Sequence, residues 1–304
     1  MRTTDILIAG AGTAGLTAAI YGCRSSMKCT VLEREMYGGQ IINTTDIENY
    51  PGMPGVDGAQ FATILHQQAE DLGAEVLFED LLSLEKGEDG WFTAVTSGGE
   101  IRAKAVIAAT GARHRKLGCE GEDKYLARGV SYCATCDGAF YRGKTTAVVG
   151  GGNSALEEAL YLSGICEKVH LIHRRDEFRA HKKTVERVLA APNIEVHYFA
   201  TTARIEGDKK VNAIVLNVPE GEKRIELDGV FVAIGLAPEN QQFAHLCQLD
   251  ETGYFVAGED CRTTCEGLFA AGDARQKPLR QLVTAAADGA VAASLAAAYI
   301  GENF

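Results

Sequence analysis

Residues 6–15 read Ile-Leu-Ile-Ala-Gly-Ala-Gly-Thr-Ala-Gly, and this stretch decides the fold of the first part of the chain. Its four leading apolar residues predict a buried strand, and Gly10, Gly12 and Gly15 then form the Gly-x-Gly-x-x-Gly pattern. Small residues over 13–21 predict a helix directly after the turn. The glycines permit a tight turn, close approach of a pyrophosphate and close packing of helix on strand. The stretch therefore predicts a dinucleotide-binding turn.

The next strand is predicted over residues 28–32 and ends at Glu33. An acid at this strand end is placed to accept hydrogen bonds from a ribose. A glycine-rich turn without a ligand is the alternative. Strand, turn, helix and acid together form a β-α-β unit, which favours a nucleotide site over that alternative.

The same pattern returns in the middle of the chain, where Gly150, Gly152 and Ala155 lie between strands predicted over 146–149 and 168–172. Here the second strand ends in basic residues: His173, Arg174, Arg175 and, one turn later, Arg179. Arginine suits a ribose 2′-phosphate, which an acid would repel. A solvated basic face is the alternative, because the basic run continues with Lys182, Lys183 and Arg187. The position at a strand end favours NADPH.

Between the two turns lies a Cys-x-x-Cys pair, Cys133 and Cys136, followed by Asp137. Such a pair can open and close a disulfide, and its geometry can bring a thiol pKa to about 7. Asp137 is a candidate proton donor. Half of a zinc site is an alternative, but a four-thiolate site would need Cys261 and Cys265, which are distant and differently spaced. We therefore expect an electron-carrying dithiol and no metal site.

Further elements complete two similar α/β halves, and the second half lies between pieces of the first. We predict two Rossmann-like domains of the three-layer ββα type, one formed by residues 1–112 and 243–304 and the other by residues 113–242. The remaining predictions are a loop over 37–58, helices over 60–72, 155–162 and the alanine-rich C-terminal stretch, and strands over 92–96, 101–103, 105–109, 194–198, 211–218, 229–234 and 267–271.

Composition narrows the function classes. The chain has 304 residues, 46% of them hydrophobic, a formal net charge of -11 and a pI near 5.2. This acidic balance argues against a nucleic-acid or anionic-membrane partner. Residues 283–300 are apolar but carry Asp288, which favours a packed helix over a membrane span. Nine cysteines, an odd number, indicate reduced thiols with one special pair, and we expect a cytoplasmic protein.

Taken in order along the chain, these motifs resemble the low-molecular-weight, bacterial-type thioredoxin reductases over essentially the whole length. The matching stretches are residues 10–15, 38–40, 48–52, 109–111, 133–138, 150–155, 173–180, 229–235, 267–273 and 280–281.

The resemblance implies FAD in the discontinuous domain and NADPH in the inserted one, in a homodimer that reduces the disulfide of thioredoxin. It implies that Cys136 faces the flavin, that Cys133 attacks the thioredoxin disulfide and that Asp137 acts as the acid. The implied FAD residues are Glu33, Gly38, Gly39, Gln40, Asn49, Asp273, Arg280, Gln281 and Leu282, besides the first glycine turn. The implied NADPH residues are Ser154, His173, Arg174, Arg175 and Arg179, besides the second.

Two positions depart from the family pattern. Many relatives carry two adjacent phenylalanines after the Asp-Gly pair for docking thioredoxin, whereas here Ala139 precedes Phe140. Cys265 stands where relatives have a small hydroxyl residue, and we assign it no role.

Three other functions stay open at this point: a flavoenzyme of the same fold fed by another donor such as ferredoxin, a dithiol oxidase, and a non-enzymatic redox or zinc module. Because the dithiol and the NADPH turn share one domain and both must reach the flavin, we also expect a rotation about a hinge near residues 112 and 243.

Overall fold

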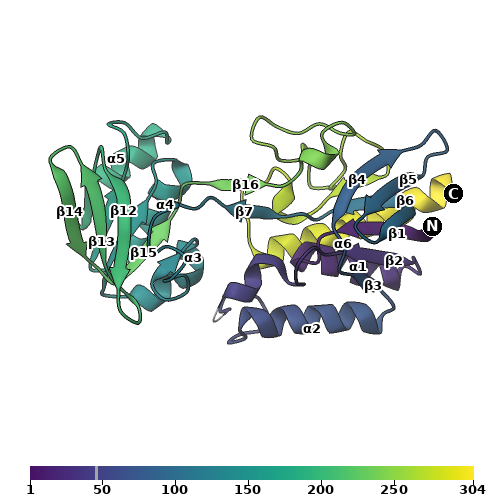
Figure 1. Cartoon of the computed structure of the whole chain (residues 1–304), viewed down its shortest axis with the longest axis horizontal. Coiled ribbons are helices and arrows are strands. Elements are labelled where there is room, and N and C mark those ends of the chain that lie inside the picture. The colour runs from purple at the N-terminus through teal and green to yellow at the C-terminus, as the bar shows by residue number, and fades with distance from the viewer. Residues whose placement is uncertain (45–46) are drawn as a thin grey trace. The chain divides into compact units, whose positions relative to one another are not determined.

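The structure is a computed structural model that describes residues 1–44 and 47–304, and the chain divides into two compact units (Figure 1). The first unit comprises Met1–Arg113 and Ala237–Phe304, and the second comprises His114–Leu236. The return to the first unit thus comes earlier than the sequence places it. The reason lies at Asn240, whose side chain hydrogen-bonds Thr110 and the carbonyls of Gly253 and Ala274 within the first unit.

The first unit is built on a sheet whose parallel strands run in the order β3-β2-β1-β6, with β17 beside the second half of β6. The antiparallel strands β5 and β4 continue from the first half of β6. The two strands predicted over 101–103 and 105–109 are therefore one strand, because Lys104 between them carries no turn signal. The bounds are β1 Arg2–Ala9, β2 Cys29–Leu32, β3 Glu75–Leu77, β4 Leu81–Lys86, β5 Phe92–Thr96, β6 Gly99–Ala108 and β17 Leu268–Ala270.

Alternation along β1 sends side chains into two separate cores. Ile6 and Ile8 pack with the helices α1 and α6, while Leu7 and Ala9 pack on the opposite face with residues of β4 and β5. The helical segments of this unit are α1 Thr13–Arg24, α2 Gly58–Asp71 and α6 Leu282–Asn303, with short 3-10 turns η1 Gly39–Asn43, η3 Gln241–Phe243 and η4 Gly272–Ala274. The loop predicted over 37–58 contains η1, and its residues 45–46 lie outside the described residues.

The C-terminal helix α6 is long and apolar enough, by length and composition, to cross a membrane. Its small residues Ala292, Ala293 and Ala296 are instead fully buried in the core that α6 shares with α1. Its carboxylate Asp288 is also buried and is paired with basic side chains of the same unit. This confirms the prediction of a packed helix.

The second unit repeats the plan. A parallel sheet of order β11-β10-β9-β15-β8 has α4 and α5 packed on one face and the antiparallel strands β12-β13-β14 on the other. Val148 points toward the helices and its neighbours Ala147 and Val149 toward the antiparallel strands. The bounds are β8 Val130–Ser131, α3 Ala134–Asp137, η2 Gly138–Tyr141, β9 Thr145–Val149, α4 Asn153–Ser163, β10 Lys168–Ile172, α5 Lys182–Ala190, β11 Ile194–His197, β12 Thr201–Gly207, β13 Val211–Val218, β14 Gly221–Glu226 and β15 Gly229–Val232.

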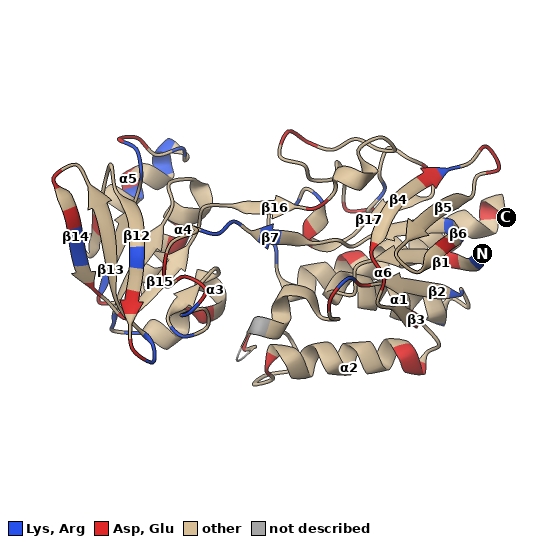
Figure 2. Ribbon diagram, viewed as in Figure 1, with Lys and Arg blue, Asp and Glu red and all other residues tan. Residues whose placement is uncertain are grey.

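Several of these elements were not predicted from the sequence, namely β8, α3, η2, α5, β12 and β14. β14 reads Gly-Glu-Lys-Arg-Ile-Glu, and of its residues only Ile225 is buried; its charged residues are coloured along the ribbon in Figure 2. It forms a strand because β13 supplies a complete antiparallel partner, a tertiary contribution that local propensity does not contain. The two chain segments that join the units, β7 Ala112–His114 and β16 Leu236–Pro238, pair with each other.

Candidate active site

The first glycine turn follows β1 and has the geometry that the sequence predicts. Gly10 has φ of 109°, and a Cβ there would lie 2.4 Å from the carbonyl oxygen of Ala109. At Gly15 a Cβ would lie 1.8 Å from the carbonyl oxygen of Gly10, so the helix can approach the strand only with glycine here. No side chain caps α1 at Gly12, which leaves the first backbone N–H groups available to a phosphate.

Glu33 stands at the end of β2 beside this turn. Its carboxylate accepts hydrogen bonds from the backbone N–H of Ala11 and of Glu35, both at 3.0 Å. Gly38 also joins the turn, because its N–H donates to the carbonyl of Ala11. The structure thus brings Glu33 and Gly38 to the glycine turn, where a ribose would lie.

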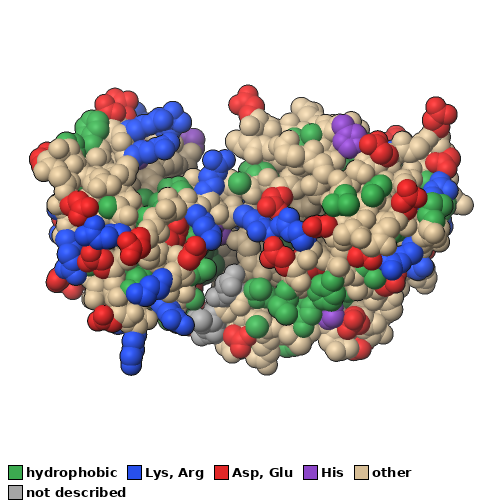
Figure 3. All heavy atoms as spheres, viewed as in Figure 1, with side chains coloured by type: hydrophobic (Ala, Val, Ile, Leu, Met, Phe, Trp, Pro, Cys, Tyr) green, Lys and Arg blue, Asp and Glu red, His purple; other side chains and the backbone are tan. Residues whose placement is uncertain are grey.

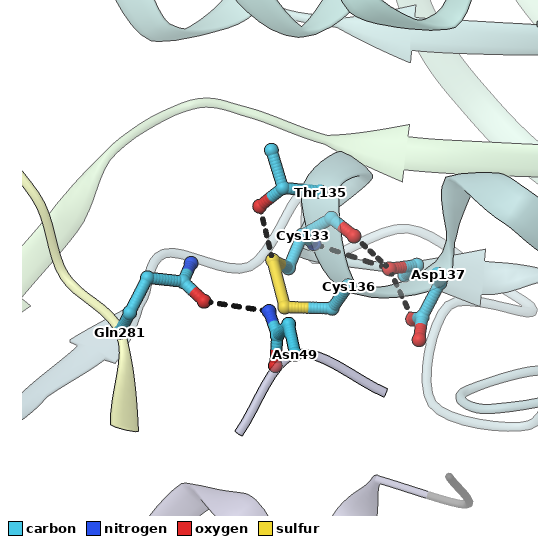
Figure 4. The surroundings of a disulfide bond; sticks show 7 residues. Asn49, Cys133, Thr135, Cys136, Asp137 and Gln281 are labelled. Atoms are coloured by element: carbon cyan, nitrogen blue, oxygen red, sulfur yellow. Dashed lines mark hydrogen bonds between the residues drawn. A yellow bond between two sulfur atoms is a disulfide. The ribbon is translucent and has the colours of Figure 1, made fainter. Parts of the chain in front are cut away.

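The other residues that the resemblance assigns to the flavin lie in three places. Gln40 hydrogen-bonds the carbonyl of Ala112, and Gly39 begins η1. Asn49 donates to the side chain of Gln281 at 2.9 Å, just ahead of Leu282 at the start of α6 (Figure 4).

Two further polar groups are buried without a partner among the described residues. They are Oδ1 of Asp273 and Nε of Arg280, whose guanidinium lies 4.4 Å from the ring of Tyr254. Burial raises the pKa of Asp273 above its usual range. Because a buried polar atom without a hydrogen bond is costly, the arrangement suits a bound polar ligand.

The second glycine turn joins β9 to α4 and is held by the loop after β10. The N–H of Arg179 donates to the carbonyl of Gly151 at 2.7 Å, and the N–H of His181 donates to Asn153 at 2.7 Å. No side chain caps α4 at Gly152, and Ser154 is exposed in the first helical turn. These N–H groups are therefore available to a second pyrophosphate.

Arg174, Arg175 and Arg179 are all exposed on this loop, and none has a side-chain hydrogen bond or ion pair within the described part of the chain. Figure 3 shows basic side chains gathered over the neighbouring α5, where Lys182, Lys183 and Arg187 are exposed. His173 differs from the arginines. It is buried, and its Nε2 lies 2.9 Å from the carbonyl of Glu177, so it organises the loop from beneath.

Cys133 and Cys136 form a disulfide across the short helix α3, with their Cα atoms 5.3 Å apart (Figure 4). The hydroxyl of Thr135 lies 3.3 Å from the Cys133 sulfur. A hydroxyl at this distance can donate to the thiolate that forms when the disulfide is reduced. Sequence reasoning missed Thr135, because nothing in the spacing shows where its side chain points.

Asp137 is anchored by a second residue that the sequence did not indicate. Ser131 in β8 donates to the Asp137 carboxylate at 2.6 Å and accepts from the N–H of Cys133 at 3.1 Å. Burial raises the pKa of Asp137 above its usual range, against the effect of the Ser131 hydrogen bond. The group therefore holds a proton more readily than an exposed aspartate, as a proton donor requires.

Glu158 in α4 is a third residue beyond the predicted site. Burial raises its pKa to about 7, although its carboxylate accepts a hydrogen bond from the backbone N–H of Ala134 in α3. Its Oε2 atom is buried with no hydrogen-bond partner among the described residues. The helix that carries the disulfide thus rests on a carboxyl group that changes charge near neutral pH.

In the wild type, the free energy of unfolding should fall as the pH rises from 5 to 8, and we expect Glu158→Gln to remove this fall. Unfolded Glu158 loses its proton near the ordinary value of 4.5, whereas the folded group keeps it to about 7, so stability falls as the pH rises through this window. The loss is on the order of 3 kcal/mol by pH 8. Urea denaturation at pH 5 and pH 8 measures it, with the exposed neighbour Glu157→Gln as control. Equal pH dependence in wild type and Glu158→Gln would contradict the expectation.

The remaining cysteines are not paired in disulfides. Cys29, Cys166, Cys247 and Cys261 are buried, and Cys23, Cys119 and Cys265 are partly exposed. The first four pack as small apolar groups in the hydrophobic cores. Burial raises the pKa of Cys247 to about 11 and that of Cys261 to about 12, so both are protonated thiols at neutral pH.

Two nucleotide-binding units and one redox-active disulfide define the class of a nucleotide-dependent disulfide oxidoreductase, and comparison with known proteins agrees. The family model described as pyridine nucleotide-disulphide oxidoreductase matches residues 4–289. Thioredoxin reductase of Treponema pallidum is 44% identical over 97% of both chains, and that of Listeria monocytogenes is 42% identical over 98% of this chain and 94% of its own. The crystal structure of thioredoxin reductase from Streptococcus pyogenes is 38% identical, with a TM-score of 0.94 over 99% of both chains.

The chain belongs to the pyridine nucleotide-disulphide oxidoreductase family and, within it, to the bacterial-type thioredoxin reductases. It is an oxidoreductase and a flavoprotein that uses a pyridine nucleotide and acts as a thioredoxin-disulfide reductase. The family, the fold class and this enzymatic function, all predicted from the sequence, are thereby confirmed.

Proposed function

We propose that the protein carries electrons from NADPH through FAD to the Cys133–Cys136 disulfide, and from there to thioredoxin. The main observation behind the proposal is that two features lie in the same unit, the second one. It holds a closed disulfide together with a glycine turn whose flanking arginines have no counterion among the described residues. A rival fed by another electron donor has no use for those arginines.

The first unit fits FAD. The uncapped start of α1 offers N–H groups to the pyrophosphate, and Glu33 lies beside it to accept from a ribose. The buried, unpartnered Oδ1 of Asp273 can accept from a sugar or polyol hydroxyl. When bound, FAD accepts a hydride from NADPH and delivers two electrons to the disulfide.

Side chains of this protein then carry out the thiol–disulfide exchange and the proton transfer. Two electrons and one proton break the S–S bond and leave the Cys133 thiolate and the Cys136 thiol, whose proton later passes to the second thioredoxin sulfur. The Cys133 thiolate, within reach of the Thr135 hydroxyl, attacks the thioredoxin disulfide and releases one thioredoxin thiolate, which Asp137 is suited to protonate. Cys136 then attacks Cys133 in the mixed disulfide, which releases reduced thioredoxin and restores the internal disulfide.

The order of the two sulfurs, Cys136 toward the flavin and Cys133 toward thioredoxin, comes from the resemblance. So does the homodimer. The hinge rotation follows instead from the sequence, which puts the dithiol and the NADPH turn in one domain although both must reach the flavin. The acidic net charge argues against nucleic-acid and anionic-membrane partners, and the odd number of scattered cysteines supports a cytoplasmic enzyme. Exposed Ala139 and Phe140 are the residues where recognition of thioredoxin can differ from that of relatives.

Arginine replacement tests the coenzyme. We expect Arg174→Ala with Arg175→Ala to raise the KM for NADPH at least tenfold, because a hydrogen bond to a charged group contributes about 1.5–3 kcal/mol. The KM for NADH, which has no 2′-phosphate, should change little. Oxidation of each coenzyme coupled to reduction of a panel of thioredoxins measures both constants, with Lys183→Ala in the same basic run as control. Equal losses with NADPH and NADH would refute 2′-phosphate recognition.

A further inference from the structure

Two buried histidines and a glutamate meet on the sheet of the second unit, and none of them takes part in the proposed reaction. His170 in β10 lies opposite Glu195 in β11, and His197 follows two residues later on the same face. His170 is 5% exposed and His197 8% exposed. Their ring nitrogens face each other, with His170 Nδ1 2.9 Å from His197 Nε2.

The carboxylate completes a set of three donor residues whose ligand atoms lie within 4.8 Å of one another. Glu195 Oε1 lies 3.4 Å from His197 Nε2, and Oε2 lies 3.8 Å from His170 Nδ1. In a tetrahedral zinc site with bonds of about 2.0–2.1 Å, neighbouring ligand atoms lie about 3.3 Å apart. The 3.4 Å distance from Oε1 to His197 is close to this value, whereas the 3.8 Å distance from Oε2 to His170 is about half an ångström longer. The two rings need to separate by a few tenths of an ångström.

We propose that His170, Glu195 and His197 bind a divalent transition-metal ion of the Zn²⁺ class, with water as the fourth ligand. Two imidazoles and one carboxylate are donors that Zn²⁺ accepts in proteins.

Two lysines compete with the ion for these ligands. Lys168 Nζ lies 2.6 Å from Glu195, and Lys223 Nζ, from β14, lies 3.7 Å from Glu195 and 3.5 Å from His197 Nδ1. Because an ammonium can only donate, Nδ1 of His197 accepts a hydrogen bond from Lys223. The ring proton of His197 is therefore on Nε2, which donates to Nδ1 of His170. Metal binding moves that proton to Nδ1 and displaces both ammonium groups.

The displacement is physically accessible. The side chains of Lys168 and Lys223 are 45% and 48% exposed, so their charges can turn into water without crossing the core. A bound ion then links β10 to β11, the strand at the edge of the sheet. Because the ion binds only the folded protein, it raises the unfolding temperature.

The experiment uses the oxidised, flavin-loaded protein after treatment with a chelator. No reductant is present, so that Cys133 and Cys136 stay joined in their disulfide and cannot bind the metal. Zn²⁺ is titrated against a chromophoric chelator, and thermal unfolding is followed with and without Zn²⁺. We expect one Zn²⁺ per chain and a rise in unfolding temperature. His197→Asn and the shape-conserving Glu195→Gln should each weaken binding at least about tenfold, the loss that even a ligand's supporting hydrogen bond can cause.

Three further variants sharpen the result. Lys223→Gln removes a competing charge and should tighten Zn²⁺ binding, an effect that a purely structural histidine pair would not produce. His245→Asn, on the exposed surface of the first unit, and the double variant Cys133→Ser with Cys136→Ser should bind as the wild type does. The proposal is overturned if the wild type binds no stoichiometric Zn²⁺, or if binding is lost in the cysteine variant and kept in His197→Asn and Glu195→Gln.

Discussion

Cys133→Ser and Cys136→Ser should each reduce NADPH-dependent reduction of thioredoxin at least about a thousandfold, because each removes one of the two sulfurs that carry the electrons. The structure has a disulfide between them in the second unit, and the proposed relay passes its electrons through this bond. A serine hydroxyl can neither form the disulfide nor accept the electron pair. Flavin reduction by NADPH, followed by stopped-flow absorbance, should survive in both variants because it precedes the thiol step.

The matched control for this experiment is Cys265→Ser. Cys265 is partly exposed and packs at the margin of a core of the first unit, and it takes no part in the disulfide. Its turnover should equal that of the wild type. If either active-site variant kept turnover close to that of the wild type, electrons would have to leave the flavin by another route, and the proposed relay would be wrong.

How much of this site the sequence reveals depends on what each residue's role requires. The glycine turns could be predicted because a fixed spacing, read with its flanking strand and helix, determines a local backbone shape. The disulfide could be predicted because its two sulfurs are near neighbours in the chain. Ser131 and Glu158 could not be predicted, since their importance arises from tertiary contacts with Asp137 and Ala134.

The elements of the fold likewise divide into those that local sequence predicts and those that depend on tertiary contacts. The buried strands β1 and β9 have apolar runs that identify them without further context. β14 and the polar helix α5 carry no such run, and they form because neighbouring elements complete their hydrogen bonds or cover one face. His170, Glu195 and His197 form a cluster only through the register of β10 on β11, which the spacing of the residues in the sequence does not reveal.

The second large effect that we expect is a loss of stability when Asp288 is replaced. Asp288 is the one acidic residue in the buried part of α6. Its carboxylate binds the guanidinium of Arg275 at 2.8 and 2.9 Å, the ammonium of Lys277 at 2.8 Å and the N–H of Gly272 at 2.9 Å. Burial alone would raise its pKa, but the hydrogen bonds from Arg275 and Lys277 hold the pKa of Asp288 below its usual range. The network ties α6 to the turn that carries Asp273.

Asp288→Asn keeps the shape of the side chain but leaves the charges of Arg275 and Lys277, each 3% exposed, without their buried counterion. Removing one member of a buried ion pair costs about 3–5 kcal/mol. In a unit of this size that lowers the unfolding temperature by about 10 °C, measurable by calorimetry, and the exposed Glu302→Gln on the same helix should leave it unchanged. The lost anchor for Gly272 should also weaken flavin retention during gel filtration. If Asp288→Asn unfolded at the wild-type temperature, the two cations would have to be neutralised by other groups, and the network would add nothing to the apolar packing that holds α6 in the first unit.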